Sequence, residues 1–336
     1  MDFLKKLNQL RDAAVLSEEM ENILRRFFFS YAEAIEQNNG QINAYQPLLL
    51  QLLDMIVEQI QSPFLFAPYH KKIKEPFDYY QFGLDFIRPI VKLDASSLFG
   101  LHNVDSIVSH LSKGGNVILF GNHQTEPDPQ AICLLLERTH PQLADDLIFV
   151  AGHRVVTDPC TVPFSKGCHL LCIYSQKYIE HPHEEKHEKL SHNRHTMKKM
   201  RELLDEGGKC IYVAPSGGRD RPGVSGEIEV APFNPQSVEM FRLMAELASH
   251  PTHFYPLALA TFDLLPPPNS VNIELGENRH TMCTPIHLAF GSEIAIDKLM
   301  GDESLNKKEK RKMIAEHIWN QVRQLYSTII ERTREL

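Results

Sequence analysis

The sequence predicts an α/β fold: a larger domain with a mixed, largely parallel sheet flanked by helices, plus a smaller N-terminal helical bundle. Three observations support this prediction. Apolar residues recur at helical spacing through the first 65 or so positions, short buried-strand patterns alternate with helical ones from residue 76 onward, and the tail repeats one apolar helical stripe. Because strands that alternate with helices favour a parallel sheet, we expect domains at residues 1–70 and 71–336.

The N-terminal bundle is expected to contain two main helices. Ser17 is a suitable N-cap, since Glu18 and Glu19 follow in the positive first turn, and Asn38-Asn39-Gly40 breaks the pattern before a second helix over residues 48–60. These helices bind either a membrane or a partner, or they form an ordinary core. We favour the core because their polar faces mix both signs of charge.

The larger domain contains several apolar runs that predict strands. The expected strands are Asn116–Gly121, Leu147–Ala151, Leu170–Tyr174, Lys209–Ala214, Phe254–Thr261, Val271–Leu275 and Ile286–Phe290. Helices are expected over Pro129–Glu137 and from Asn306 to the end. This alternation predicts a crevice for ligands beyond the carboxyl ends of the strands.

Composition and charge exclude several classes of protein. The chain is 43% hydrophobic with a net charge of −8, so it is not expected to bind nucleic acid, and any basic docking surface must be local. It has no run of about 18 apolar residues and no signal or transit pattern at its start, which predicts a soluble, cytoplasmic protein or a mature form that has already been processed. Its six cysteines lie mostly in apolar runs, as buried reduced thiols do.

A histidine and an aspartate follow the first strand of the larger domain. His123 comes directly after the strand, and Asp128 precedes Pro129 at the start of a helix. Across such a turn the carboxylate is able to orient the imidazole, which then acts as a general base. The alternative is structural, with Asp128 as an N-cap. Two ligands are too few for a metal site, so we expect no metal.

A second cluster follows the strand that ends at Ala214. In Ser216-Gly217-Gly218-Arg219-Asp220-Arg221, the paired glycines and two arginines indicate an anion-binding loop. The alternatives are a solvated loop or pairing of Asp220 with the arginines. A nucleophilic Ser216 is disfavoured because Ala214 replaces the glycine that a sharp elbow needs.

An ordered set of motifs resembles one enzyme family. The set comprises Asn122–Glu126 with Asp128-Pro129, Phe149–Gly152, Thr157–Pro159, Pro163–Ser165, Ala214–Pro222, and upstream Glu75–Tyr80 and Ile87–Pro89. It resembles the soluble, plastid-type (acyl-ACP) glycerol-3-phosphate acyltransferases, within the H-x4-D glycerolipid acyltransferases, over residues 65–290. Pro127 is a departure from the family pattern, which usually has a small residue at this position of the motif.

The resemblance implies acyl transfer from an acyl carrier protein or coenzyme A thioester to the sn-1 hydroxyl of glycerol 3-phosphate, without a cofactor. His123 would be the base and Asp128 its orienting partner. Arg219, Arg221, Lys177 and Tyr178 would bind the glycerol phosphate, although Tyr178 replaces a histidine of the family and adds no positive charge. A monomer with transient membrane contact is expected. The alternatives are 1-acylglycerol 3-phosphate as acceptor, or a non-catalytic acyl- or phospholipid-binding protein.

Two further features have structural alternatives. Basic clusters at Lys198–Arg201 and Lys307–Lys312 either dock an acidic acyl carrier or the phosphates of coenzyme A, or are solvated helix faces. The histidine-rich stretch over residues 181–195 places His183 and His187 four apart. We interpret this stretch as a solvated loop or helix end and not as a metal site, because it has no apolar stripe.

Overall fold

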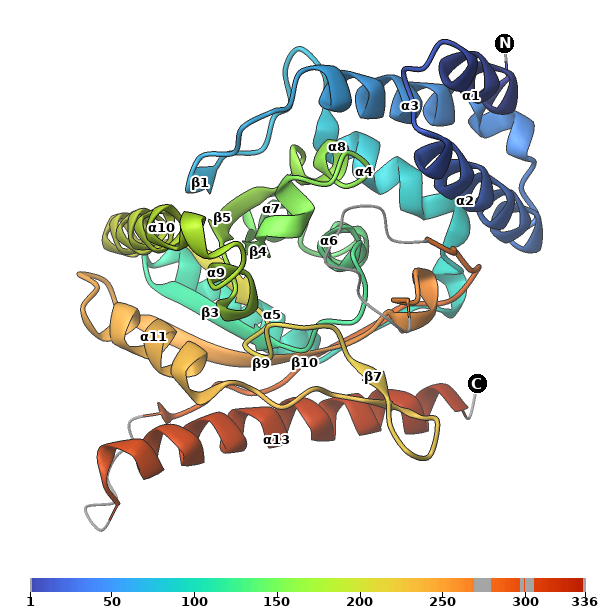
Figure 1. The fold of residues 1–336 in the computed structure, drawn as a ribbon. Helices are drawn as coiled ribbons and strands as arrows, with labels where there is room; N and C mark the ends of the chain where they lie inside the picture. The colour runs from blue at the N-terminus through green and yellow to red at the C-terminus, as the bar shows by residue number, and fades with distance from the viewer. Residues whose placement is uncertain (1, 269–278, 297–298, 300–304, 335–336) are drawn as a thin grey trace.

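A mixed eight-stranded sheet forms the centre of the molecule (Figure 1). The computed structural model describes residues 2–268, 279–296, 299 and 305–334, and it describes no side chain at residues 176 and 177. The strand order is β1-β5-β4-β6-β3-β9-β10-β2. The strands are β1 (Tyr69–His70), β2 (Ser97–Phe99), β3 (Asn116–Gly121), β4 (Ile148–Gly152), β5 (His169–Ile173), β6 (Cys210–Val213), β9 (Thr252–Ala260) and β10 (His287–Phe290), with β7 (Arg221–Pro222) and β8 (Ile228–Glu229) in a separate hairpin.

Five neighbouring strands of the sheet are parallel, which brings their carboxyl ends to one edge. The register pairs Val117 of β3 with Cys210 of β6 and with His253 of β9, and β4 pairs in parallel with both β5 and β6. The antiparallel pairs are β10 with β9 and β1 with β5. The loops that follow β3, β4, β5, β6 and β9 therefore gather at the edge where ligands bind in such sheets.

Helices cover both faces of the sheet. One face packs against α10, α11 and α13, and the other against α4–α7, with α1–α3 lying beyond them (Figure 1). The helices are α1 (Phe3–Asp12), α2 (Glu18–Gln37), α3 (Gln46–Gln61), α4 (Tyr79–Ile87), α5 (Leu101–Ser112), α6 (Asp128–Leu136), α7 (Pro141–Asp146), α8 (Val162–Ser165), α9 (Gln176–Ile179), α10 (Lys186–Glu206), α11 (Pro235–Glu246) and α13 (Lys307–Arg334).

Strand β3 shows why the sheet needs both helical layers. All six of its residues are buried, and its side chains alternate between the two apolar cores. Ile118 and Phe120 join the core beneath α10, α11 and α13, whereas Val117 and Leu119 join the core that extends to α1–α3. Burial on both faces explains the unbroken apolar run in the sequence.

Most of the predicted elements are confirmed. Ser17 accepts a hydrogen bond from the backbone N–H of Met20 at 3.1 Å, as an N-cap does. The strands agree with the predictions within one or two residues at each end, and the predicted strand at Val271–Leu275 lies outside the described residues. The short strands β1, β2, β7 and β8 were not predicted. The domain boundary after residue 70 stays a prediction.

The histidine-rich stretch is mostly exposed and leads into the start of a helix, as predicted. Its second half is the start of the 21-residue helix α10 and is partly buried. Lys189 is 5% exposed and donates to the carbonyls of Tyr178 and His181, while a ring nitrogen of His192 lies 3.0 Å from the Cys172 carbonyl. The few buried contacts of this stretch come from the long side chain of Lys189 and the hydrogen-bonded ring of His192.

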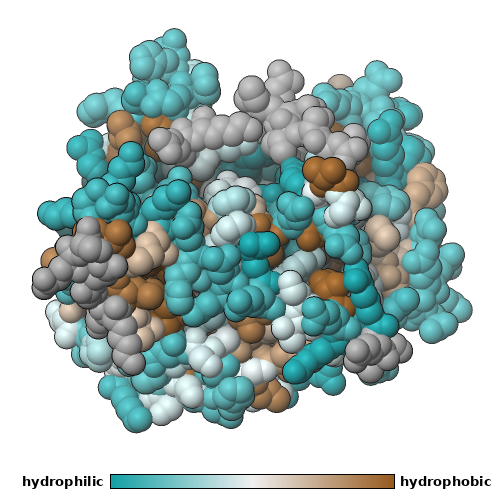
Figure 2. All heavy atoms as spheres, turned by 90° about the horizontal axis from the view of Figure 1, so that it is seen from below, coloured by the Kyte–Doolittle hydropathy of each residue, from teal (hydrophilic) through white to brown (hydrophobic). Residues whose placement is uncertain are grey.

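The face of the molecule on the α13 side is largely hydrophilic (Figure 2). Viewed from the α13 side, hydrophobic residues form separate patches among hydrophilic ones (Figure 2). Among the described residues, no helix has both the length and the apolar character needed to cross a bilayer.

Candidate active site

A cavity of about 890 Å³ opens at the carboxyl edge of the parallel strands. Its polar part is lined by His123 after β3, His153 after β4, Tyr178 after β5, and Arg219 and Arg221 after β6. The two motifs recognised in the sequence therefore share one cavity, although they are almost 100 residues apart.

His123 and Asp128 form a hydrogen-bonded pair at this edge. The imidazole Nδ1 lies 2.7 Å from Asp128 Oδ2, and the His123 side chain is 33% exposed, whereas that of Asp128 is 1% exposed. The neutral ring donates its Nδ1 proton to the carboxylate, which leaves a lone pair on Nε2, on the opposite side of the ring. A general base requires this tautomer.

Asp128 is not the side-chain N-cap that the structural alternative required. Its Oδ2 accepts from the backbone N–H groups of Gln124 at 2.8 Å and Thr125 at 3.3 Å, and its Oδ1 accepts from the Thr261 hydroxyl at 2.6 Å. The carboxylate thus points back toward the His123 loop, and helix α6 has no side-chain cap bond. The Asp128 carboxylate therefore holds both the His123 loop and the His123 imidazole in place.

The residues on either side of His123 fasten the loop to the interior. Asn122 bonds both the N–H and the carbonyl of Leu259, at 2.8 and 3.0 Å, and Gln124 accepts from the N–H groups of Thr261 and Phe262. Asn122 and Gln124 are fully buried. In this extended segment alternate side chains point in opposite directions, so their anchoring directs His123 toward the cavity.

Asp220 connects the arginine loop to the His123 loop on their buried side. It is fully buried, and its Oδ2 accepts from Asn122 at 2.7 Å and Gln124 at 3.2 Å, while its Oδ1 accepts from the Ala231 N–H. Burial raises the pKa of Asp220 to about 6, although these hydrogen bonds oppose the rise. Asp220 is therefore directed into the protein, whereas Gly217 and Gly218 are exposed, so burial of Asp220 alone does not decide between an anion-binding loop and a solvated one.

The two arginines beside Asp220 line the cavity, as do Gly217 and Gly218. Arg221 donates from Nη1 to the Pro268 carbonyl at 2.9 Å, and Gly217 has the positive φ of 66° that glycine adopts readily. A Cβ at either glycine would meet only open space, which leaves the backbone of the loop accessible from the cavity. The Ser216 hydroxyl donates to the Gly218 carbonyl at 2.9 Å, within the turn.

The other two predicted binding residues lie in the short helix α9. Tyr178 lines the cavity, and the Lys177 side chain lies outside the described part of the structure. His153 was not predicted. It stacks on Tyr174 with ring centroids 4.4 Å apart, and burial lowers its pKa, which keeps this second imidazole neutral at neutral pH.

The rest of the cavity is apolar and extends to the N-terminal helices. Its walls include side chains from α2, α3, α4 and α8, namely Ile23, Leu24, Phe27, Leu52, Ile56, Phe86 and Phe164. Cys160 and Cys168 also line it, and burial raises the pKa of each thiol to about 12. These thiols are protonated at neutral pH and are therefore poor nucleophiles.

Sequence reasoning missed a buried arginine at the cavity wall. Arg279 bonds Glu126 at 2.7 Å and Asp158 at 2.9 Å, and its side chain is 9% exposed. It thereby ties the His123 loop to the segment after β4. Its partners lie 153 and 121 residues away in the sequence, so no local pattern indicated this role.

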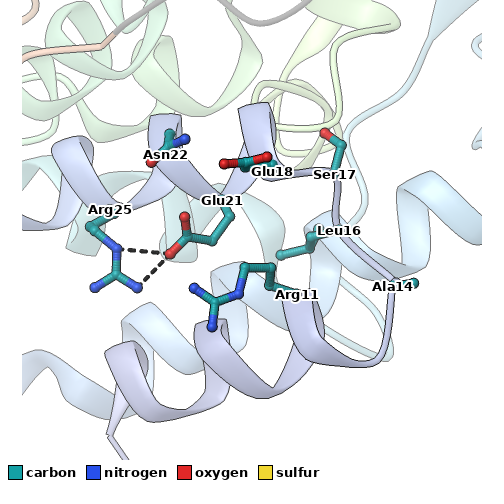
Figure 3. Close-up of a pocket in the computed structure, with 8 residues that line it drawn as sticks. All are labelled: Arg11, Ala14, Leu16, Ser17, Glu18, Glu21, Asn22 and Arg25. Carbon is teal, nitrogen blue, oxygen red and sulfur yellow. Dashed lines mark hydrogen bonds and ion pairs between the residues drawn. The ribbon is translucent and has the colours of Figure 1, made fainter.

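A second hollow, of about 810 Å³, lies between the end of α1 and the start of α2 (Figure 3). Both of its arginines are paired: Arg25 with Glu21, and Arg11 with Asp12 at 2.8 Å. Because both arginines already have carboxylate partners, this hollow is poorly suited to an anion.

Comparison with known proteins identifies the family of this chain. A family model described as "Acyltransferase" matches residues 102–260, which contain the His123 and Arg219 loops. A chloroplastic glycerol-3-phosphate acyltransferase of Cucurbita moschata is 40% identical over 332 residues, covering 98% of this chain and 71% of the relative. The chain belongs to the glycerol-3-phosphate acyltransferase family.

Other members of the glycerol-3-phosphate acyltransferase family match over most of the chain. The Spinacia oleracea protein is 39% identical over 83% of this chain and 59% of its own length, and the Arabidopsis thaliana protein is 33% identical over 98% and 72%. The family predicted from the motifs is confirmed. These relatives are named chloroplastic, so the cytoplasmic location predicted for this chain stays a prediction.

Proposed function

We propose that this chain transfers a fatty acyl group from a thioester to the sn-1 hydroxyl of glycerol 3-phosphate, giving 1-acylglycerol 3-phosphate. One observation carries the proposal: a histidine–carboxylate pair, two arginines and a long apolar wall line a single cavity. The names of the relatives, all glycerol-3-phosphate acyltransferases, support the same acceptor.

The phosphate is held by the arginine loop. Arg219 and Arg221 offer planar guanidinium groups that match phosphate oxygens in bidentate geometry, and Tyr178 adds a hydroxyl donor. Lys177, on the same short helix, contributes a further positive charge. Binding at this loop brings the glycerol hydroxyl toward His123, which lies in the same cavity.

His123 then performs the proton transfers. Its Nε2 removes the proton of the sn-1 hydroxyl as that oxygen attacks the thioester carbonyl, while Asp128 stabilises the imidazolium through Nδ1. The tetrahedral intermediate collapses, the C–S bond breaks, and the thiolate takes the proton back from His123. The thioester is already activated, so this route needs neither a covalent enzyme intermediate nor a cofactor.

The apolar part of the cavity receives the acyl chain. Phe27, Leu52 and Phe164 belong to its walls, so the N-terminal helices form part of the acyl site. The carrier, either acyl carrier protein or coenzyme A, stays outside the cavity and docks by its charge. Transient membrane contact accompanies release of the lipid product from the monomer.

A thiol-release assay tests the proposal. Purified protein is mixed with an acyl carrier protein or coenzyme A thioester and glycerol 3-phosphate, and the product is identified by mass spectrometry. His123→Ala should lower kcat/KM by about 10²–10⁴-fold, the usual contribution of a general base. The matched control is His140→Ala, whose ring pairs with Asp105 at 3.0 Å outside the cavity and should leave turnover unchanged.

The same assay separates the alternatives. Thiol release with 1-acylglycerol 3-phosphate in place of glycerol 3-phosphate would indicate the other acceptor. If neither acceptor releases thiol, while lipid binding survives in His123→Ala, the protein is a non-catalytic binder and the proposal is wrong.

A further inference from the structure

A second cluster of histidine and carboxylate groups lies at the opposite edge of the sheet. His110, His253 and Glu293 place their ligand atoms within 4.8 Å of one another. Nδ1 of His253 lies 2.6 Å from Glu293 Oε1, Nε2 of His110 lies 3.6 Å from Glu293 Oε2, and the imidazole rings stack with centroids 3.5 Å apart.

The three residues come from separate elements that the fold holds in place. His110 is in the last turn of α5, His253 is the second residue of β9, and Glu293 follows β10. Backbone hydrogen bonds to β9 bracket Glu293, from the N–H of Gly291 to the Pro256 carbonyl at 2.9 Å and from that of Ile294 to the Phe254 carbonyl at 2.8 Å. The cluster is therefore built into the sheet.

This cluster is remote from the proposed active site. His253 pairs in register with Val117 near the start of β3, and His123 comes six residues later. At the rise of an extended strand this corresponds to about 20 Å. A ligand bound at this cluster therefore affects the stability of the fold and does not contact the groups that react in the proposed active site.

We propose that His110, His253 and Glu293 bind one divalent transition-metal ion, with Zn²⁺ the preferred ion. Two imidazole nitrogens and one carboxylate oxygen form a ligand set that suits Zn²⁺, whereas Mg²⁺ and Ca²⁺ favour oxygen ligands throughout. The side chains are 22–44% exposed, so a water molecule from solvent completes the fourth position. The ion joins α5, β9 and the segment after β10.

Binding the ion requires the three side chains to rearrange. Tetrahedral Zn²⁺ at about 2.0–2.1 Å from each ligand atom separates those atoms by about 3.4 Å. The longest separation in the cluster is within 4.8 Å and closes by about 1.4 Å at most, whereas the 2.6 Å contact between His253 and Glu293 opens. The stacked rings of His110 and His253 also turn apart, so that a nitrogen lone pair of each points to the ion. Rotation of the exposed Glu293 side chain, which carries two oxygens, supplies the rest of the movement.

Calorimetric titration of the full-length protein with Zn²⁺, after removal of bound metal by a chelator, tests the site. We expect one tight equivalent per chain and a Tm that rises with Zn²⁺ concentration. Glu293→Gln, which keeps the shape of an exposed side chain, should weaken binding at least tenfold and abolish the rise in Tm. His187→Ala is the control, because His187 lies on α10 outside the cluster, and it should bind as the wild type does.

Two further measurements keep the test decisive. Co²⁺ bound at this site should show the visible absorption of a four-coordinate complex without the near-ultraviolet band of a thiolate ligand. His253→Asn provides a second ligand variant if Glu293→Gln does not fold. Equal affinity in the wild type and in the ligand variants would reduce the cluster to a hydrogen-bonded group and overturn the proposal. These readouts do not involve turnover, so they are independent of the proposed acyltransferase activity.

Discussion

The two edges of the central sheet each carry a histidine–carboxylate pair of nearly the same length. His123 lies 2.7 Å from Asp128 at the carboxyl edge, and His253 lies 2.6 Å from Glu293 at the amino edge of the parallel strands. The distance between histidine and carboxylate therefore does not distinguish a general base from a candidate metal ligand. The two pairs differ in the residues that surround them.

Those surroundings differ in burial and in donors. Asp128 is buried and accepts hydrogen bonds from four groups, which fixes the His123 ring and its tautomer. The Glu293 side chain is 44% exposed and faces a second imidazole, that of His110. A buried, fully hydrogen-bonded carboxylate beside a cavity suits proton transfer, whereas an exposed carboxylate beside two imidazoles suits an ion.

The largest effect is expected from Asp128→Asn. The amide cannot accept the Nδ1 proton and stabilise the imidazolium as the carboxylate does, so kcat should fall by about 10²–10⁴-fold, measured by thiol release. Asp105→Asn is the matched control, because Asp105 pairs with His140 and its side chain is 71% exposed. A loss of activity no greater than the loss of folded protein would leave Asp128 with a structural role only.

An intermediate effect is expected from the arginine loop. Arg221→Ala removes a charge-assisted contact to phosphate worth about 1.5–3 kcal/mol, which corresponds to a rise of about 10–100-fold in KM for glycerol 3-phosphate. The KM for the acyl thioester should change much less. Arg11→Ala, which removes an exposed arginine paired with Asp12, should alter neither constant. Equal rises in both constants would argue against a phosphate site at this loop.

The sequence predicted the features that depend on local pattern. Unbroken apolar runs such as β3 indicated a doubly covered sheet, and His123 and the arginine loop each followed such a run. Parallel strands then place both motifs at one edge, so the pattern also predicted that they meet. Whether Asp128 caps its helix or turns back to His123 depends on donors such as Thr261, which is 133 residues away.

Contacts between distant segments were beyond the sequence patterns. Asp220 was predicted to lie in a loop with the arginines, but it anchors to Asn122, 98 residues earlier. The expectation that no metal binds considered His123 with Asp128 and the stretch at residues 181–195, where histidines are close in sequence. His110, His253 and Glu293 come together only because β10 runs antiparallel to β9.

The smallest expected effect is on the pH dependence of the free energy of unfolding. It arises from the buried carboxyl group of Asp220. Burial raises its pKa from 3.8 to about 6, so between these values the folded protein binds more protons than the unfolded chain. The free energy of unfolding contributed by this group therefore falls as pH rises through the window, by at most about 3 kcal/mol. Asp220→Asn lacks this titration.

Urea unfolding of the wild type and Asp220→Asn between pH 4 and 7 measures this difference. A change in hydrogen bonding shifts the free energy of unfolding of the variant by the same amount at every pH, so it does not affect the slope against pH. The difference in free energy of unfolding between the wild type and Asp220→Asn should therefore become less favourable to the wild type as pH rises. Parallel curves for Asp220→Asn would mean that the hydrogen bonds from Asn122, Gln124 and Ala231 offset burial, and that the pKa of Asp220 is not raised in the folded protein.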